Sequence, residues 1–224
     1  MQHAKFYQDI YFRYFCRRLM SANMELKNVV FDLGGVLIDW NPRYLYRSYF
    51  ECESEMEYFL ENVCTQQWNE RHDAGVSFES NARSLIERFP QYEEAIRLYD
   101  TGWEKMLGGE IAGTLETLHA LKNRGYKVYA LSNWSAEKFP IAMERFRFLG
   151  EMDGIVVSGR EKVIKPDPRI FEIILERYGL SARESVFIDD NQRNVKAARR
   201  LSMTGIRFET PQKLSEQLVR LGVL

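Results

Sequence analysis

The chain has 224 residues, of which 45% are hydrophobic and 28% charged, and its mean hydropathy is −0.40. This composition is typical of a soluble globular protein that can bury a substantial core. Lysine plus arginine nearly balance aspartate plus glutamate, at 31 against 32, so no nucleic-acid partner is predicted. Three scattered cysteines are too few for a disulfide framework or a zinc site, which favours a reducing, cytoplasmic location.

No run of about 18 apolar residues occurs, so neither a membrane-spanning helix nor a stable membrane association is expected. Residues 1–23 form an N-terminal extension that is rich in aromatic residues, carries a net charge of +3 and lacks the apolar segment of a signal peptide. Three interpretations remain open. The start is assigned too early and Met24 is the first residue, or an amphipathic helix docks on a partner or membrane surface, or a helix packs on the core.

Regular secondary structure is predicted from Lys27 onward. Residues 29–31 are β-branched and aromatic and are followed by Gly34-Gly35, which predicts a short buried strand. From Pro42 to Gly108 the sequence shows helical periodicity and no second strong strand. This segment is therefore predicted to be a helical insert of roughly 65 residues.

Strands and helices alternate in the rest of the chain. Helix caps such as Asp167-Pro168 and Gly179 mark the helix ends, and Pro140 requires one helix to begin near it or to kink. The predicted strands cover residues 127–131, 155–157, 185–188 and 205–208, and the predicted helices cover residues 111–124, 136–148, 168–178, 191–201 and 211–221. Five short strands separated by helices predict an α/β fold with a parallel sheet.

Polar residues follow four of these strands. Parallel sheets bind ligands at the carboxyl ends of their strands, so these residues are the candidates for a functional site. They are Asp32 after the first strand, Ser132 and Asn133 after the second, Lys165 in the loop after the third, and Asp189 and Asp190 after the fourth. If the strand ends converge, the site contains three carboxylates, one ammonium group and one hydroxyl.

This combination of groups favours metal-dependent phosphoryl transfer. Three neighbouring carboxylates repel one another, and Mg²⁺, which prefers oxygen ligands, removes that repulsion. A lysine and a serine beside the cation would bind phosphate, and a carboxylate can attack phosphorus to form an aspartyl-phosphate. Each residue alone is also explained as a helix cap, a turn residue or a solvated lysine, but the ordered set at four strand ends favours function.

Four segments, FDLGGVLID, LSN, KPDPRIF and FIDDNQRN, resemble in this order the four motifs of the haloacid dehalogenase superfamily, most of whose members are Mg²⁺-dependent phosphatases. The resemblance is strongest to the bacterial branch with FDLGNV- or FDLGGV-type first motifs, which includes sugar-phosphate phosphatases. It implies a Rossmann-like parallel-sheet core made of residues 24–40 and 109–224. Residues 41–108 would form an inserted helical cap domain of the first cap subclass.

The resemblance also implies roles for the candidate residues. Asp32 would be the catalytic nucleophile and a metal ligand. Lys165 would be a second catalytic residue that stabilises the nucleophile and the transferring phosphoryl group. Ser132 and Asn133, together with Lys165, would bind the substrate phosphate.

The metal site implied by the resemblance is a Mg²⁺ site. Asp189, Asp190 and the backbone carbonyl of Gly34 would contribute to it beside the nucleophile. Which of the two adjacent aspartates is the direct ligand remains open. Asn194 would either orient this acidic loop or lie on a helix surface.

One position departs from the superfamily pattern. Most phosphatases of the superfamily carry a second aspartate, a general acid and base, two residues after the nucleophile, and this chain has Gly34 there. General acid–base catalysis contributes about 10²–10⁴-fold. A substrate with a good leaving group, such as a sugar 1-phosphate or an acyl phosphate, would avoid part of that loss. Otherwise Glu70, His72 or Asp73 would replace the aspartate, and of these His72 has an ordinary pKa near neutrality.

The predicted function is Mg²⁺-dependent hydrolysis of a small-molecule phosphate ester, such as a sugar phosphate, through an aspartyl-phosphate. Two alternatives remain. A metal-independent 2-haloacid dehalogenase would also lack the second aspartate, but Asp189 and Asp190 would then repel its anionic substrate. A non-catalytic phosphosugar-binding module would tolerate Gly34 but would gain nothing from Asp32.

Overall fold

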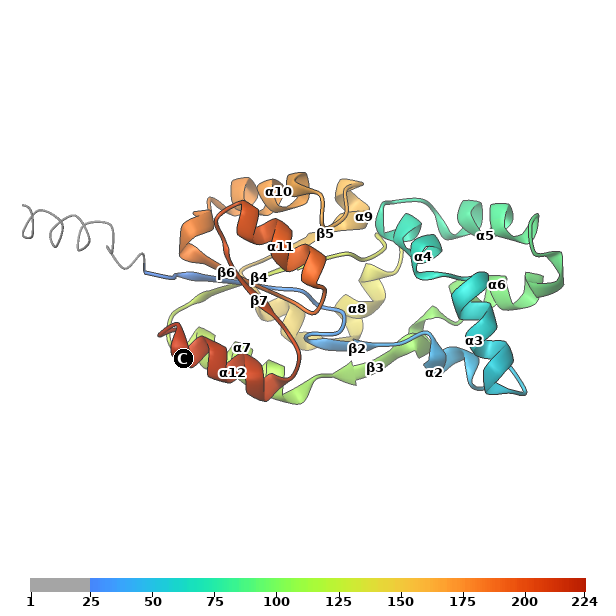
Figure 1. Ribbon diagram of the computed structural model, residues 1–224, viewed down its shortest axis with the longest axis horizontal. Helices are drawn as coiled ribbons and strands as arrows, with labels where there is room; N and C mark the ends of the chain where they lie inside the picture. Colours follow the sequence, from blue (N-terminus) through green and yellow to red (C-terminus); the bar gives the residue numbers. More distant parts are fainter. Residues whose placement is uncertain (1–24) are drawn as a thin grey trace, which may run out of the picture.

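The computed structural model describes residues 25–224, so the predictions for residues 1–23 lie outside the described residues. A five-stranded parallel sheet with the strand order β5-β4-β1-β6-β7 forms the centre of the fold (Figure 1). Its strands are β1 (Asn28–Phe31), β4 (Lys127–Ser132), β5 (Gly154–Val157), β6 (Ser185–Asp189) and β7 (Thr204–Arg207). The predicted α/β fold with a parallel sheet is confirmed.

Helices cover both faces of the sheet. They are α7 (Ala112–Asn123), α8 (Phe139–Arg145), α9 (Ser158–Glu161), α10 (Pro168–Tyr178), α11 (Gln192–Arg200) and α12 (Pro211–Arg220). Val29 and Phe31 of β1 pack in one buried cluster with α7 and α12, and Val30 packs in the other with α10 and α11. Burial of both faces is the reason why the strands read as continuous apolar runs.

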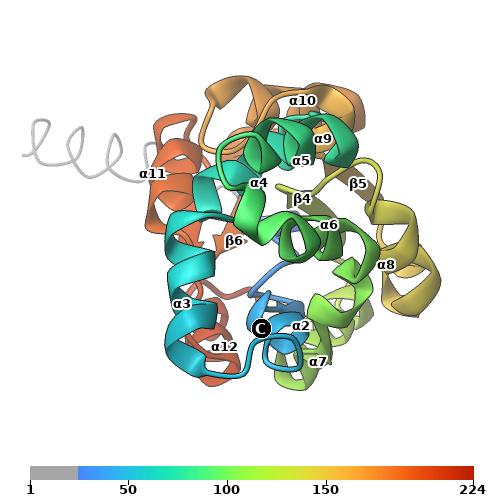
Figure 2. The ribbon, with the colours of Figure 1, turned by 90° about the vertical axis from the view of Figure 1, so that its right-hand side faces the viewer.

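A second group of helices follows β1 in the chain and lies beyond the carboxyl ends of the sheet strands (Figure 2). It comprises α2 (Arg43–Tyr46), α3 (Glu53–Asn62), α4 (Gln66–Asp73), α5 (Phe78–Ile86) and α6 (Glu93–Thr101), with 3₁₀ turns at Pro90–Tyr92 and Trp103–Met106. Side-chain caps begin α4 and α5, where Thr65 and Ser77 accept hydrogen bonds from Trp68 N and Ser80 N. The division into a core and a cap domain stays a prediction.

An antiparallel pair of strands connects the two groups of elements. β2 (Ile38–Trp40) pairs with β3 (Leu107–Glu110). The expectation that no second strong strand occurs between Pro42 and Gly108 is therefore wrong at β3, which begins at Leu107. Its sequence LGGE contains two glycines and no β-branched residue, so pairing with a distant segment, rather than intrinsic propensity, makes it a strand. The predicted boundary between residues 108 and 109 falls inside this strand.

The helix expected over residues 136–148 is shorter than predicted. Pro140 stands at the start of α8, which ends at Arg145, and a 3₁₀ helix over Arg147–Glu151 follows. Proline has no N–H to donate and fits the first turn of a helix, which explains where α8 begins. Among all the helices of residues 25–224, none is both long enough and apolar enough to span a membrane.

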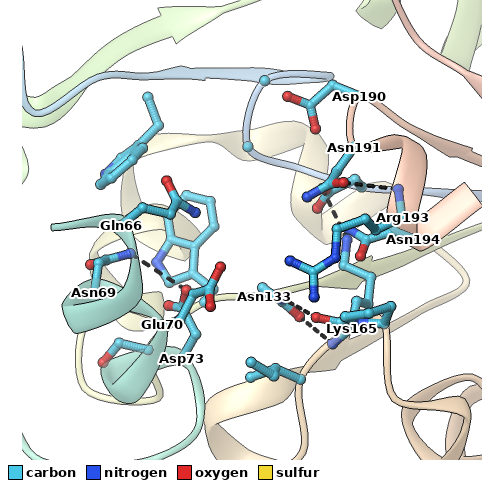
Figure 3. Close-up of a pocket in the computed structure, with 18 of the residues that line it drawn as sticks. Gln66, Asn69, Glu70, Asp73, Asn133, Lys165, Asp190, Asn191, Arg193 and Asn194 are labelled. Carbon is cyan, nitrogen blue, oxygen red and sulfur yellow. Dashed lines mark hydrogen bonds and ion pairs between the residues drawn. The ribbon is translucent and has the colours of Figure 1, made fainter. Parts of the chain in front are cut away.

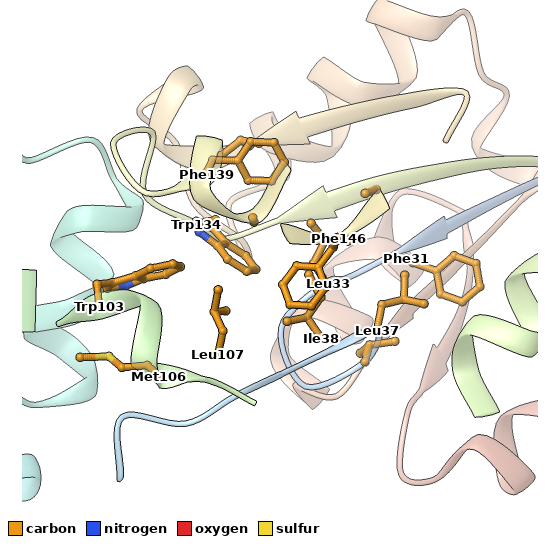
Figure 4. Close-up of a cluster of buried hydrophobic side chains, with 14 of the residues drawn as sticks. Phe31, Leu33, Leu37, Ile38, Trp103, Met106, Leu107, Trp134, Phe139 and Phe146 are labelled. Atoms are coloured by element: carbon orange, nitrogen blue, oxygen red, sulfur yellow. The ribbon is translucent and has the colours of Figure 1, made fainter. Parts of the chain in front are cut away.

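The hydrophobic core is continuous from the sheet into the inserted helices. Phe31 and Leu33, at the end of β1, belong to the same buried cluster as Trp103 and Met106 from the insert (Figure 4). The ring of Trp103 packs on that of Trp134, with 5.6 Å between the ring centroids. This shared core holds the insert over the edge of the sheet where the predicted site residues lie.

Candidate active site

Asp32 follows β1 directly, and three groups position its carboxylate. Leu33 N donates to Oδ1 at 2.7 Å, Ser132 Oγ donates to the same oxygen at 3.0 Å, and Lys165 Nζ lies 2.9 Å from Oδ2. Asp32 lines a cavity of about 570 Å³ whose walls come from the sheet edge and from the inserted helices (Figure 3). The predicted nucleophile is thus held in a defined orientation in the wall of a cavity.

Lys165 is fully buried, and every proton of its ammonium group has an acceptor. Nζ donates to Asp189 Oδ2 at 2.7 Å and to the backbone oxygen of Leu131 at 2.9 Å, and it contacts Asp32. Burial by itself lowers the pKa of Lys165, but Asp189 and Asp32 more than offset this effect, so the pKa lies above its ordinary value. Lys165 therefore remains positively charged beside Asp32.

The two adjacent aspartates have different environments. Asp189 is completely buried and accepts hydrogen bonds from Lys165, from Asn191 N at 2.8 Å and from Asn194 Nδ2 at 3.0 Å. Asp190 is exposed and lines the cavity. The environment of Asp189 suits a group that holds Lys165, whereas Asp190 is the aspartate that faces the cavity. Asn194 lies inside this network and not on a helix surface.

The three aspartates are close enough to share one cation. Asp32, Asp189 and Asp190 each offer a carboxylate oxygen, and these oxygens all lie within 4.8 Å of one another. A donor set made only of oxygen fits a hard divalent ion such as Mg²⁺. Gly34, whose backbone carbonyl is the further predicted ligand, lines the same cavity.

The charges of this cluster are costly without a cation. Burial, aided by Asp189 and Asp190 and opposed by Lys165, raises the pKa of Asp32 to about 8. Although Asp190 is exposed to the cavity, the protein around it removes part of its hydration, and this desolvation together with the charge of Asp189 raises its pKa as well. A divalent cation at this position would favour the ionised carboxylates and oppose both shifts. The residues present therefore fit a Mg²⁺ ion.

The predicted phosphate-binding residues meet at the end of β4. Ser132 is buried and donates to Asp32. The side chain of Asn133 lines the cavity, accepts a hydrogen bond from Lys165 N at 2.8 Å and donates to the Lys165 carbonyl at 3.0 Å. Asn133 thus holds the loop that carries Lys165. The sequence does not reveal this contact, because the two residues are 32 positions apart in the chain. The role of Asn133 in binding phosphate stays a prediction.

The two glycines after Asp32 differ in what they permit. Gly35 has a φ of +74°, and a Cβ at this position would lie 2.7 Å from Asp190 Oδ2. Gly34 has no such left-handed φ, and a Cβ there would meet no atom within 4 Å. The backbone therefore requires glycine at position 35 but would accept a side chain at position 34.

Gly35→Ala is expected to displace Asp190 and to add strain of about 1–2 kcal/mol, because alanine disfavours a positive φ. The expected result is a lower Tm and a higher Mg²⁺ concentration for half-maximal thermal stabilisation. Gly34→Ala is the matched control, since it adds the same methyl group without the clash. Equal effects of the two substitutions in a thermal shift titration would contradict this interpretation.

The family model of haloacid dehalogenase-like hydrolases matches residues 26–201, which is most of the chain. The chain belongs to this family. The matched residues include Asp32, Ser132, Lys165 and Asp190.

Individual relatives of this haloacid dehalogenase-like hydrolase have different substrates in their names. A sesquiterpene phosphatase from Aspergillus oryzae is 27% identical and aligns over 80% of this chain and 88% of its own. A phosphorylated carbohydrates phosphatase from Thermotoga maritima is 28% identical over 78% of this chain and 81% of its own. A Bacteroides thetaiotaomicron family enzyme, solved as a magnesium complex, has a TM-score of 0.67 and 22% identity over 86% of this chain and 98% of its own. Dehalogenase structures also share the fold.

The cavity of this haloacid dehalogenase-like hydrolase has a polar wall that the sequence analysis identified only in part. One face of α4 supplies Gln66, Asn69, Glu70 and Asp73 to it. Their spacing of three, four and seven residues is the helical pattern for residues on one side, which is the signal that could have found them. Other lining residues, such as Arg193, come from segments that only the fold brings together.

His72 does not lie in this wall, which removes it as a replacement for the missing acid. It is buried, stacks on Phe78 with 3.8 Å between ring centroids, and contacts Asn81 Nδ2 through Nε2 and the Val76 carbonyl through Nδ1. Burial lowers its pKa to about 4. The expectation based on the ordinary pKa of histidine is wrong because both ring nitrogens are used to hold α4 against α5.

Proposed function

We propose that this chain is a Mg²⁺-dependent phosphatase that hydrolyses a small phosphate ester through an aspartyl-phosphate. The observation that carries the proposal is the position of Asp32: its carboxylate lies 2.9 Å from the Lys165 ammonium, shares a cluster with Asp190 and faces the cavity. This combination of nucleophile, cation ligands and positive charge suits attack on a phosphorus atom.

The chain's own groups would act in a defined order. Asp32 attacks phosphorus in line with the ester oxygen, while Lys165 and the hydroxyl of Ser132 hold charge near the transferring group. Asp189 positions Lys165 through its hydrogen bond to the ammonium group, and Asp190 together with Asp32 would hold Mg²⁺. When bound, the ion neutralises negative charge on the phosphoryl oxygens. Water then hydrolyses the aspartyl-phosphate and restores the Asp32 carboxylate.

A sugar phosphate is the substrate class that we favour. The cavity holds amide and carboxyl side chains of Gln66, Asn69 and Glu70 that can bind hydroxyl groups, and the half-buried ring of Trp40 can pack on a sugar face. The name of the Thermotoga maritima relative, a phosphorylated carbohydrates phosphatase, supports a sugar phosphate, whereas the Aspergillus oryzae relative is named a sesquiterpene phosphatase.

Asp190 argues against the two alternative functions. In a metal-independent 2-haloacid dehalogenase its carboxylate, with that of Asp32, would repel an anionic haloacid inside the cavity. In a non-catalytic phosphosugar-binding module both carboxylates would repel phosphate. With Mg²⁺ bound, the carboxylates of Asp32 and Asp190 would be ligands of the cation, and they would no longer repel a phosphate.

A substrate panel tests the proposed function. The purified chain is incubated with sugar phosphates, nucleotides, acyl phosphates and aryl phosphates, with and without Mg²⁺, and released phosphate is measured. We expect turnover that EDTA abolishes and excess Mg²⁺ restores. Halide release from 2-haloacids that EDTA leaves unchanged would show a dehalogenase instead. Binding of phosphosugars without phosphate release would show a binding module.

A further inference from the structure

One carboxyl group in the cavity has no part in the chemistry described so far. Asp73 ends α4 and lines the cavity on the side opposite Lys165 and Asp190 (Figure 3). It is only 9% exposed, and within residues 25–224 it forms no ion pair. Its one side-chain hydrogen bond there comes from Asn69 Nδ2 at 3.5 Å. A buried carboxyl group with so few partners requires a reason.

The surrounding contacts fix the position of Asp73. Its backbone oxygen accepts a hydrogen bond of 2.6 Å from Ser158 Oγ, which in turn accepts one from Trp134 N. These bonds join the end of α4 to the core next to β4 and β5. On the other side, Tyr99 donates to Asn69 Oδ1 at 2.9 Å, which turns the Asn69 amide nitrogen toward Asp73 Oδ2.

The environment of Asp73 keeps it partly protonated at neutral pH. Burial, together with the negative charge of Glu70 on the same helix, raises its pKa to about 7, against the opposing effect of the Lys165 ammonium. Ser158, the neighbour from α9, is uncharged. A group that is protonated in part of the molecules near neutrality can both donate and accept a proton.

We propose that Asp73 is the acid that protonates the leaving oxygen of the phosphate ester and the base that activates the hydrolytic water. The inference rests on the proposed phosphatase function and on the position of Asp73 in the same cavity as Asp32. Gly34, two residues after the nucleophile, has no side chain to serve this purpose, and His72 is not among the residues that line the cavity.

Asp73 donates the proton that the first step needs and takes up the proton that the second step releases. In the first step, the Asp32 carboxylate forms a bond to phosphorus and the ester P–O bond breaks. The leaving oxygen takes the proton of the Asp73 carboxyl group, so the alcohol departs neutral and Asp73 becomes a carboxylate. In the second step, water attacks the aspartyl-phosphate and gives its proton to Asp73. Phosphate leaves, and Asp32 and Asp73 regain their starting states.

The test compares Asp73→Asn with Glu70→Gln on phosphate esters that differ in leaving-group pKa, from 4-nitrophenyl phosphate to simple alkyl phosphates. Glu70 is the matched control because it lies one turn earlier on the same face of α4 and lines the same cavity. For Asp73→Asn we expect kcat/KM to fall roughly 10²–10⁴-fold with alkyl phosphates and less than tenfold with 4-nitrophenyl phosphate. Glu70→Gln removes a group that lines the cavity and that raises the pKa of Asp73, so it is expected to change kcat/KM by a similar factor with all esters. The difference between alkyl phosphates and 4-nitrophenyl phosphate should therefore stay close to that of the wild type.

A second readout separates the two roles of the proposed acid and base. With 4-nitrophenyl phosphate, Asp73→Asn should release a burst of nitrophenol equal to the enzyme concentration, because hydrolysis of the aspartyl-phosphate becomes slow. An equal loss of kcat/KM with all esters, or no loss, would overturn the proposal.

The wild-type chain gives a test that does not depend on a folded variant. With Asp73 in place, its kcat/KM should depend weakly on leaving-group pKa, and a steep dependence would also overturn the proposal. Absence of turnover with every ester would instead show that the proposed phosphatase function is wrong, and this inference with it.

Discussion

Asp32→Asn is expected to reduce kcat roughly 10⁴-fold or more, the largest effect of any single substitution in this chain. An amide is a poor nucleophile, and it cannot form the aspartyl-phosphate on which the proposed reaction depends. The amide also loses the ionic contact with Lys165, which lies 2.9 Å from the carboxylate. Phosphate release from the best substrate of the panel, measured at saturating Mg²⁺, provides the rate.

The control for this substitution is protein stability. Burial raises the pKa of Asp32 in the folded chain to about 8. At a pH above the pKa of Asp32 in the unfolded chain, the ionised form of Asp32 therefore opposes folding. A neutral amide at this position is expected to leave the Tm without Mg²⁺ unchanged or to raise it. Lys165 keeps Asp189 as an ionic partner in the variant. Activity within tenfold of the wild type in a folded variant would contradict the assignment of Asp32 as nucleophile.

Asp190→Ala is expected to raise the Mg²⁺ concentration for half-maximal activity by more than roughly 100-fold. Loss of a hydrogen-bond partner of a metal ligand typically weakens metal binding by roughly 10–100-fold, and loss of the ligand itself should have a larger effect. Asp190 is the aspartate of the pair that lines the cavity, and a Mg²⁺ site with few protein carboxylates cannot lose one without weakening. The increase of Tm on adding Mg²⁺ should become much smaller, because a ligand stabilises the folded state by RT ln(1 + [L]/Kd), which falls as the Kd for Mg²⁺ rises.

Glu70→Gln is the matched control for the metal experiment, since it removes a cavity carboxylate that lies outside the cluster of three. It is expected to keep a Mg²⁺ titration close to that of the wild type. Asp189→Asn is the opposite case, because it removes the buried partner of Lys165 and should lower the Tm even without Mg²⁺. A normal Mg²⁺ titration of Asp190→Ala would show that the ion binds elsewhere.

Local sequence was sufficient to predict most of the sheet. The run VVF before Asp32 and the run SVFI before Asp189 are apolar because both faces of those strands are covered, and that pattern is visible without a structure. The strand β3 was missed, because its glycine-rich sequence has no strand propensity of its own. Only its pairing with β2, some 70 residues away in the chain, makes it extended.

The sequence predicted which residues meet at the sheet edge, but not which of them face the cavity. Asp32, Lys165 and Asp190 could be named because each follows a strand, and parallel strands end at one edge. Lys165 and Asn194 donate hydrogen bonds to the carboxylate of Asp189 and hold it in the protein interior. Asp190 is therefore the aspartate that faces the cavity. Such contacts join residues from different elements, so adjacent letters in the sequence do not reveal them.

By itself, therefore, the sequence determined the parallel α/β core and the set of groups that can carry phosphoryl transfer, because both follow from patterns along the chain. Tertiary structure alone decided which groups meet solvent and which are buried. It turned His72 into a packing residue with a pKa of about 4 and left Asp73, its neighbour, facing the cavity with a pKa of about 7. Burial and hydrogen-bond partners set these proton affinities, and both are properties of the packed chain.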